Sequence, residues 1–345
     1  MGNHSLPATD HRAPFRPFPR RLRVLPVALA LAVLLLCAAA GLGAAKLTIS
    51  VIDVGHGDAI LVQFPNGDEM LVDAGKQGAS KKVVEYLDRQ GVDDLELLVA
   101  THPDEDHIGG IPNVLASRKV AKAWISGYEP DKLTGDGGVF ATATPPVVAE
   151  KPIAGQQMSF GGATVTVVAP LTLRSFSNVN DNSVVLRITY GNTSALLTGD
   201  MEKKERASIT SWQHADVLKV AHHGSENGTD TAFIQALKPK FAVISDDRKQ
   251  GNGSDPVGPL LTAQLGDYYS TAGDGTVVFV SDGTSFQAYP PHGSTTTAPP
   301  GQVYTTSGGS KYHRADCRYL GASRRAMTKA EAVAKGYSPC RSCMQ

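Results

Sequence analysis

The sequence predicts a mixed α/β (α+β) fold in which strands end in loops that hold polar and charged side chains. Short segments alternate between apolar and polar residues or run apolar, as at residues 46–54 and 95–100, which is typical of strands. Residues 80–90 predict a helix, with Ser80 as its N-cap and Gly91 as its stop signal. Clusters of His and Asp directly follow several predicted strands, where a rigid sheet can present them to a ligand.

The same signals place the other elements in chain order. Strands are predicted at residues 60–64, 70–72, 122–125, 164–168, 184–190, 194–197, 216–220, 241–245, 276–280 and 284–289, and helices at residues 110–117 and 201–211. Pro65, Asn66, Gly67 and Asp68 predict a hairpin turn between two of these strands. Residues 127–157 are rich in Gly, Pro and Thr and lack periodicity, so we expect a flexible loop over the site.

The densest chemistry lies in the loop that follows the predicted strand at residues 95–100. His102, Asp104, Asp106 and His107 place two imidazoles and two carboxylates within six residues. Imidazole and carboxylate ligands suit Zn, Mn or Fe, and two of each can begin a two-metal site. The alternative is a solvated acidic turn, in which such a concentration of His and acidic residues is rare.

The spacing of these four residues resembles the metal-binding signature HxHxDH of the metallo-β-lactamase superfamily, with Asp104 in place of the middle His. That substitution, together with the trailing Gly109-Gly110, is similar to the extracellular hydrolase domain of ComEC/Rec2-type competence proteins and their free-standing relatives. The resemblance extends over about residues 47–289. Near its start, His56 stands where the family usually has Gln.

The resemblance implies a four-layer αββα sandwich, with two packed sheets, outer helices and metal ligands on strand-end loops at one edge. Two divalent cations would be held there, with Asp200 bridging them and Asp73 hydrogen-bonding the metal loop. Carboxylate-rich ligation shifts the metal preference from Zn toward Mn or a mixed site. The implied ligands of the main site are His102, Asp104, Asp106, His107, Asp200, His222 and His223, of which Asp106, Asp200 and His223 are also assigned catalytic roles.

Two assignments stay open. One imidazole of the pair His222 and His223 would bind the second cation, and the other would orient a ligand or the substrate phosphate; we favour His222 as the ligand. Asn182 and Ser183 stand near the point where lactamase relatives commonly place a third His ligand, and they either contact substrate or bound water or form a capping turn. The loop after residues 241–245 contains no His, whereas ComEC relatives often have His-Pro there.

This ligand set predicts hydrolysis by a water that two cations activate. We expect an exported phosphodiesterase or nuclease, whose substrate is extracellular DNA, RNA or another phosphodiester. Two alternatives use the same residues: a hydrolase of a lactam, lactone or other small ester, and a non-catalytic exported protein whose metals are structural. No protein partner is inferred.

Residues 1–45 predict a secretory signal peptide or an N-terminal membrane anchor. An Arg-rich segment precedes an apolar run over residues 24–40, and small residues follow before Lys46. The run is slightly short for a spanning helix, and the alternative to cleavage is membrane attachment through residues 24–45. The predicted location is therefore secreted, or at the outer face of a bacterial cytoplasmic membrane.

Charge separates the rest of the chain into two parts. The whole chain is formally neutral, but residues 46–300 carry a net charge of −10 and residues 301–345 one of +6. An acidic domain over residues 46–289 suits carboxylates gathered around cations. The Pro- and Thr-rich residues 290–301 predict a linker to a small basic domain at residues 302–345.

The small domain predicts a second metal site. His313, Cys317, Cys340 and Cys343 supply the four ligands of a closed tetrahedral zinc site, and a domain of this size needs such a staple. The alternative is one disulfide with a free thiol. The segment resembles the Ada-like Cys-rich modules at the ends of some exported bacterial nucleases and hydrolases. Its basic charge either binds phosphate backbones or only solvates a stabilising module.

Overall fold

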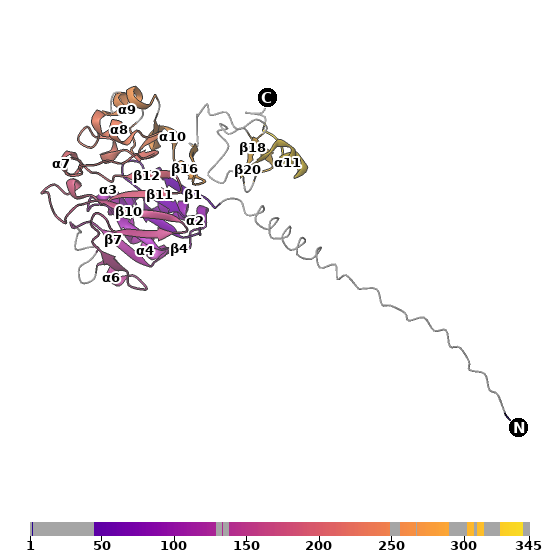
Figure 1. Cartoon of the computed structure of the whole chain (residues 1–345), viewed down its shortest axis with the longest axis horizontal. Helices are drawn as coiled ribbons and strands as arrows, with labels where there is room; N and C mark the ends of the chain where they lie inside the picture. The colour runs from indigo at the N-terminus through magenta and orange to yellow at the C-terminus, as the bar shows by residue number, and fades with distance from the viewer. Residues whose placement is uncertain are drawn as a thin grey trace. The chain divides into compact units, whose positions relative to one another are not determined.

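The computed structural model describes residue 2 and residues 45–128, 133, 138–248, 256–266, 268–289, 302–306, 309–313 and 325–340. Residues 45–289 contain two large β-sheets (Figure 1). The first has the strand order β17-β16-β1-β2-β3-β5-β7-β8, and the second has the order β15-β14-β13-β12-β11-β10-β9.

The strands of the first sheet are β1 Leu47–Val51, β2 Ile60–Gln63, β3 Glu69–Val72, β5 Leu97–Ala100, β7 Lys122–Ile125, β8 Val148–Glu150, β16 Val277–Ser281 and β17 Phe286–Tyr289. Those of the second are β9 Gln157–Phe160, β10 Ala163–Ala169, β11 Val185–Tyr190, β12 Thr193–Leu197, β13 Val217–Lys219, β14 Phe241–Ile244 and β15 Tyr269–Ser270. The short strands β4 Asp94–Leu95 and β6 Lys119–Val120 pair with each other beside the first sheet.

The two sheets pack face to face because their side chains alternate in direction. In β5, Leu97 and Val99 belong to the apolar core between the sheets, whereas Leu98 and Ala100 pack on the opposite face. This period of two is what a strand buried on both faces produces. The inner core also receives Val165 and Val167 of β10 and residues of β12, β13 and β14 from the second sheet.

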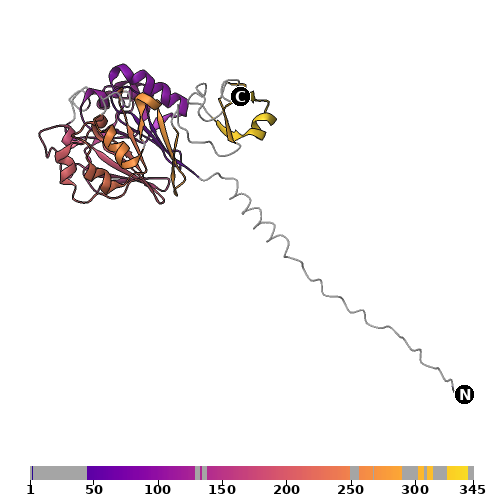
Figure 2. The same cartoon turned by 90° about the horizontal axis from the view of Figure 1, so that it is seen from above.

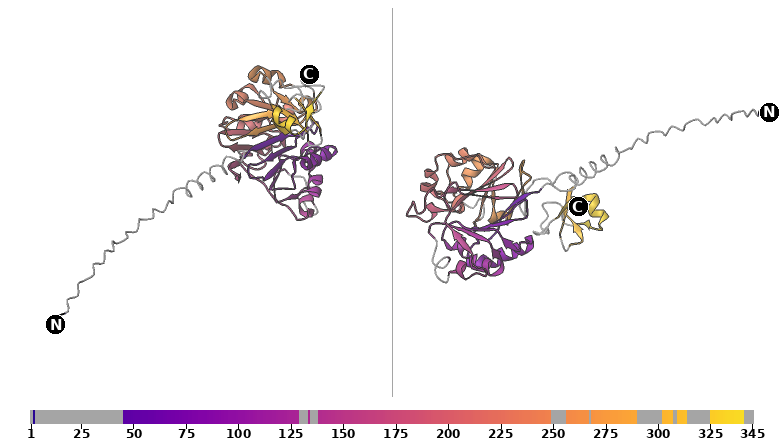
Figure 3. Two further views of the ribbon diagram at one scale, coloured as in Figure 1. Left: turned by 90° about the vertical axis from the view of Figure 1, so that its right-hand side faces the viewer. Right: turned by 60° about the horizontal axis from the view of Figure 1, so that its bottom comes forward.

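Helices cover both outer faces, as Figures 1 and 2 show and the two views of Figure 3 repeat. On the first sheet these are α2 Ser80–Gln90, α4 Ile111–Ser117 and α6 Val139–Thr142, and on the second they are α8 Thr231–Leu237 and α9 Gly258–Leu265. The remaining helical segments are η1 Gln77–Ala79, α3 Glu105–Ile108, η2 Asn180–Asn182, α7 Lys203–Ser208, η3 Ala221–Gly224 and α10 Thr271–Asp274. The predicted four-layer αββα sandwich is confirmed.

Three local predictions were wrong. Ser80 does not cap α2, because the short helix η1 precedes it and the Ser80 hydroxyl donates to the carbonyl of Gln77 at 2.7 Å. The helix predicted at residues 201–211 is only the six residues of α7. Residues 138–150 are not a loop over the site: Phe140 and Val147 are buried in the outer layer of the first sheet, and β8 pairs with β7. Elements this short leave no periodicity to read.

Strand direction brings the polar loops to one end of the sandwich. β3 and β5 are parallel, so Asp73 and the metal loop follow them at the same edge. β12, β13 and β14 are also parallel, and Asp200, His222-His223 and Asp246 follow their ends. The carboxyl ends of parallel strands are where such folds collect ligand-binding side chains.

The tail is described in part. β18 Gln302–Thr305 pairs with β20 Arg325–Thr328, β19 Lys311–Tyr312 pairs with β21 Ser338–Pro339, and α11 Lys329–Ala334 starts at a capping box of Thr328 and Glu331. Apart from residues 2 and 45, the predicted leader lies outside the described residues, and so does the predicted linker. In the part of the chain that the structure describes, no helix combines the length and the apolar character that a bilayer crossing requires.

Candidate metal centre

A buried carboxylate fixes the loop that carries most of the predicted ligands. Asp73 accepts hydrogen bonds from the backbone N–H of Thr101 at 2.8 Å and from its hydroxyl at 2.7 Å. Its second oxygen also accepts from Nδ1 of His107 at 2.7 Å. The expectation that Asp73 hydrogen-bonds the metal loop is therefore confirmed.

Asp200 lies at the centre of the site, among four imidazoles. Its carboxylate is 3.2 Å from Nε2 of His107 and 3.3 Å from Nε2 of His223. The Nε2 atoms of His222 and His102 lie 3.7 and 3.8 Å from it. The structure thus brings together side chains that the sequence separates by about a hundred residues, and it does so around one carboxylate.

The imidazoles share one orientation: Nδ1 faces an acceptor of the protein and Nε2 faces the carboxylates. Nδ1 of His223 donates to the carbonyl of Ser245 at 2.7 Å, and Nδ1 of His102 lies 3.1 Å from the hydroxyl of Thr101. Nδ1 of His222 lies 2.9 Å from the carboxylate of Glu202. Engaging one ring nitrogen in this way leaves the other with a lone pair for a metal ion.

The spacing of the inward-facing atoms fits divalent cations. Ligand atoms that each lie about 2.0–2.2 Å from one ion are roughly 3–3.5 Å apart. Nε2 of His107 is 3.2 Å from Oδ1 of Asp200, and Nε2 of His223 is 3.4 Å from Oδ2 of Asp106. Nε2 of His102 and Oδ1 of Asp200 are buried without a hydrogen-bond partner among the described residues, which a bound cation would correct.

Four groups of three potential ligands occur among the described residues, and two of them contain at least two of the predicted metal ligands. His102, His107 and Asp200 form a buried triad whose ligand atoms lie within 4.8 Å of one another. His56, Asp106 and His223 form a second, partly exposed triad by the same measure. Asp200 contacts residues of both triads, as expected for a carboxylate between two cations.

The electrostatics of the centre favour cationic charge. Burial disfavours the charged ring of His107, but Asp200 and Asp73 outweigh burial and raise the pKa of His107 well above its ordinary value. In His223 the carboxylates of Asp200 and Asp106 likewise outweigh burial and raise the pKa to about 9. Burial opposes ionisation of Asp200, yet His107 and His223 hold the pKa of that carboxyl well below its ordinary value. The lowered pKa of Asp200 favours its ionised form, which attracts positive charge.

Two predicted ligands are less central. The side chain of Asp104 is 46% exposed and its carboxylate is 3.6 Å from Nε2 of His102, at the solvent side of the centre. His222 is also partly exposed, whereas His223 is buried and belongs to a ligand triad. Our preference for His222 as the ligand of that pair is not favoured by this geometry, and the assignment of both His as ligands stays a prediction.

Asn182 and Ser183 are bonded within a turn. The side chain of Asn182 donates to the carbonyls of Phe176 and Asn178, and the hydroxyl of Ser183 donates to the carbonyl of Asn180. Of the two alternatives left open for this pair, the capping turn is the one that the structure shows.

Sequence reasoning missed three residues of the site. Glu202 follows Asp200 closely and contacts His222, and His56 and Asp246 extend the centre from two distant loops. His56 lies between two glycines directly after a predicted strand, and this position was the only available signal. Asp246 follows β14 as the predicted ligands follow β5 and β12.

A buried ion pair between Lys219 and Asp58 lies beside the metal centre. Nζ of Lys219 lies 2.8 Å from Oδ2 of Asp58, and both side chains are almost fully buried. Oδ1 of Asp58 is 3.6 Å from Nδ1 of His223, so the pair borders the site.

Gly57 lets the first loop approach the metal loop, and we expect Gly57→Ala to disturb both. A Cβ at residue 57 would stand 2.2 Å from the carbonyl oxygen of Asp106, which also accepts from the N–H of Asp58 at 3.1 Å. Relief of that clash should cost roughly 1–3 kcal/mol of unfolding free energy. It should also lower metal affinity about 10-fold, because the ligand Asp106 must move.

Gly67→Ala is the matched control. Gly67 also has a positive φ, of 92° against 133° for Gly57, but a Cβ at residue 67 would meet no other atom within 4 Å. Thermal unfolding and metal titration of both variants separate backbone strain from the contact. Equal metal affinity of the two variants would show that the approach of the loops does not position Asp106.

The predicted tail site is visible only in part. Strands β19 and β21 are parallel, with Tyr312 paired to Pro339, and the N–H of Cys340 donates to the carbonyl of Tyr312 at 2.9 Å. This register brings His313 and Cys340 side by side at the ends of the two strands, and both are buried. Cys317 and Cys343 lie outside the described residues, so the tail zinc site stays a prediction.

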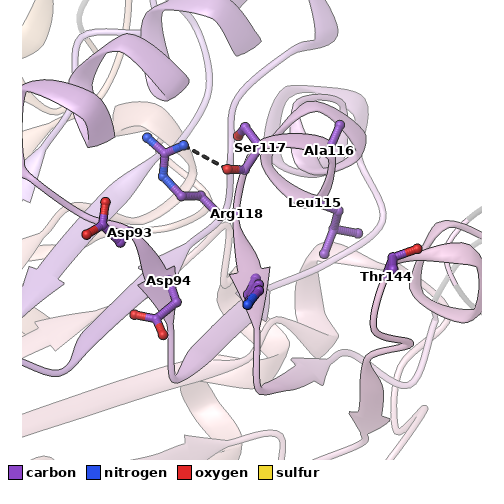
Figure 4. Close-up of a pocket in the computed structure, with 8 residues that line it drawn as sticks. Asp93, Asp94, Leu115, Ala116, Ser117, Arg118 and Thr144 are labelled. Carbon is purple, nitrogen blue, oxygen red and sulfur yellow. Dashed lines mark hydrogen bonds between the residues drawn. The ribbon is translucent and has the colours of Figure 1, made fainter.

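A cavity of about 380 Å³ lies away from the metal centre. Its lining residues are Asp93, Asp94, Leu115, Ala116, Ser117, Arg118, Lys119 and Thr144 (Figure 4). Asp94 precedes β5 whereas the metal loop follows it, so cavity and centre are at opposite ends of that strand. Arg118, which donates to the carbonyl of Ser117, is also paired with Asp88. We assign this cavity no role in the chemistry.

The fold and the candidate centre define a class of metal-binding protein: an αββα sandwich with His and Asp clusters at one end of its sheets. The family model of the metallo-beta-lactamase superfamily matches residues 52–245, which is more than half of the chain. The protein belongs to the metallo-beta-lactamase superfamily.

Two proteins resemble more than half of the chain in sequence. ComE operon protein 3 of Bacillus subtilis is 32% identical over 57% of this chain and 28% of its own length. Recombination protein 2 of Haemophilus influenzae is 30% identical over 58% of this chain and 24% of its own length. The chain thus spans about a quarter of these relatives. The crystal structure of YhfI from Bacillus subtilis superposes with a TM-score of 0.48 at 14% identity, covering 68% of this chain and all of YhfI.

Proposed function

We propose that this protein is an exported phosphodiesterase that hydrolyses DNA or RNA with two divalent cations, Zn or Mn. The observation that carries the proposal is the position of Asp200 between two ligand triads, within 3.3 Å of a ring nitrogen from each. Pairs of cations that share ligands are typical of enzymes that displace an oxygen at phosphorus.

The protein's own residues supply most of what the reaction needs. His102, His107 and Asp200 would hold one cation, and Asp106, His223 and Asp200 the other. When bound, two cations provide Lewis-acid activation of a water and neutralise charge on a phosphoryl oxygen. Asp73 and Ser245 accept hydrogen bonds from Nδ1 of His107 and His223, and so aim the Nε2 atoms of both rings at the centre.

His222 is suited to orient the substrate. Its side chain is 29% exposed, the carboxylate of Glu202 lies 2.9 Å from Nδ1, and Nε2 faces the carboxylate of Asp200. With a proton on Nε2, the ring can donate to a phosphate oxygen that also meets the cations. We therefore assign His222 to substrate positioning, and its direct role as a ligand is secondary.

The relatives support a nucleic-acid substrate. Two of them are named Recombination protein 2 and Competence protein ComA, and a third is ComE operon protein 3. We extend the association with recombination and competence, which these names state, to this chain. We also propose that it acts at the outer side of the cytoplasmic membrane, in agreement with the leader predicted at residues 1–45.

The test is a substrate panel on the purified protein with added Zn or Mn. We expect turnover of bis-p-nitrophenyl phosphate and cleavage of single-stranded or duplex DNA or RNA, because two cations neutralise phosphodiester charge. A chromogenic cephalosporin and a lactone are the comparison substrates. Turnover of these alone would establish a small-ester or lactam hydrolase instead, and metal binding with no turnover of any substrate would establish a non-catalytic protein.

Deletion of residues 301–345 should affect the rate of hydrolysis and the affinity for long DNA differently. We expect hydrolysis of the small phosphodiester to remain within about twofold, since none of the ligands of the main centre lies in the tail. Binding of long DNA should weaken, because the tail carries a net charge of +6.

The slope of log affinity against log salt measures that contribution. Each lost phosphate contact reduces the slope by about 0.9 for duplex DNA. Equal affinity and equal slope in the truncated and full-length proteins would show that the tail does not bind nucleic acid.

A further inference from the structure

His56 is the imidazole of the centre to which no role has been given. It lies in the loop between β1 and β2, flanked by Gly55 and Gly57, and its side chain is 38% exposed. Its Nε2 is 3.3 Å from Oδ2 of Asp106, and Nε2 of His223 is 3.4 Å from the same oxygen. The two rings lie with their centroids 4.5 Å apart. His56 and His223 therefore approach Asp106 from two sides at ligand spacing.

Asp246 holds the ring of His56 in this orientation. Nδ1 of His56 donates to Oδ1 of Asp246 at 2.9 Å, and the other oxygen of Asp246 pairs with Arg248. The backbone of Asp246 exchanges two hydrogen bonds with the hydroxyl of Thr271, both at 3.0 Å. Burial opposes ionisation of Asp246, but the bonds from His56 and Arg248 hold the pKa of that carboxyl below its ordinary value.

The same arrangement occurs at His107, whose Nδ1 donates to Asp73 and whose Nε2 faces Asp200. Asp246 engages Nδ1 of His56, so Nε2 is the ring atom that faces the carboxylate of Asp106, at 3.3 Å. This is the spacing of two ligand atoms that share one cation. A carboxylate, an imidazole and a cation in line are a recurrent feature of metal sites in proteins.

We propose that His56 is a ligand of the divalent cation held by Asp106 and His223, and that Asp246 is its positioning residue. This cation then has two imidazoles and one carboxylate of its own, matching the buried triad of His102, His107 and Asp200. The inference rests on the two-metal centre of the proposed function but not on the substrate.

Metal binding of His56→Gln tests the proposal directly. We expect one of the two equivalents of Mn²⁺ that the main centre binds to be held at least about 10-fold more weakly in equilibrium dialysis, while the other equivalent and any ion in the tail site keep their affinity. Asp246→Asn should weaken the same equivalent by a smaller factor. His214→Gln is the matched control, because His214 is a half-exposed histidine that also pairs with an aspartate, Asp216, outside the centre.

The absorption spectrum of His56→Cys with Co²⁺ distinguishes a metal ligand at residue 56 from a residue that only stabilises the fold. If the side chain at residue 56 enters the coordination sphere, Co²⁺ should produce a thiolate-to-metal charge-transfer band beyond any given by the cysteines of the wild type. His214→Cys should give none. Full affinity for both equivalents in His56→Gln, together with no added band in His56→Cys, would overturn the proposal.

The outcome is independent of hydrolysis. If the second cation depends on His56 but no phosphodiester is cleaved, the ligand assignment holds and the proposed function is wrong. If DNA is cleaved and metal affinity does not depend on residue 56, the proposed function holds and the ligand assignment is wrong.

Discussion

Asp200→Asn is expected to reduce phosphodiester hydrolysis by about 10³-fold or more while leaving the fold intact. The carboxylate lies within 3.8 Å of four imidazole nitrogens and contacts both ligand triads, so it is the group that both cations share. The amide has the same shape but no charge. Losing several kcal/mol of transition-state stabilisation, at about 1.4 kcal/mol per tenfold, gives a change of this size.

Rates, metal content and thermal unfolding should be measured together on this variant. Asp282→Asn is the control: Asp282 is exposed and accepts hydrogen bonds from the N–H groups of Thr284 and Ser285, which an amide oxygen can also accept. A folded Asp200→Asn protein that turns over like the wild type would rule out the two-metal mechanism.

Lys219→Met should destabilise the protein by about 3–5 kcal/mol, because it leaves the buried carboxylate of Asp58 without its positive partner. For a domain of this size the midpoint of thermal unfolding should fall on the order of 10 °C. Lys219 also donates to the carbonyl of Val220 at 3.0 Å, and Met cannot replace that bond.

A double variant identifies the cause of the loss. If the unpaired charge dominates, adding Asp58→Asn to Lys219→Met should recover part of the stability, since the buried site then holds no net charge. Lys203→Met, at an exposed position of α7, is the control and should change stability by less than about 0.5 kcal/mol. A Lys219→Met protein whose stability stays within about 1 kcal/mol of wild type would mean that water reaches Asp58.

What could be predicted from the sequence depended on whether the signal is local. The metal loop was predictable because His102, Asp106 and His107 are close in sequence and follow a clearly apolar strand. The role of Asp73 came from resemblance and was confirmed by its hydrogen bonds.

The pairing of His56 with Asp246 was not predictable in this way. The two residues are 190 positions apart, and their contact depends on how β1 and β14 are placed in different sheets. The strand β8 and the helix α6 were not predicted for another reason. Each has only three or four residues, which is too short for a periodic pattern of apolar residues to be recognised.

The centre draws its ligands from both sheets: His102, His107 and Asp106 follow β5 of the first, and Asp200 and His223 follow β12 and β13 of the second. Bound cations would therefore cross-link the first sheet to the second at one end of the sandwich. At a hundredfold excess over the dissociation constant, each ion adds about 2.7 kcal/mol to the free energy of unfolding. At the outer side of the membrane, where we propose that the protein acts, a molecule stripped of its metals would also be the one most readily opened and digested by proteases. Metal supply would then set the lifetime of the protein as well as its activity.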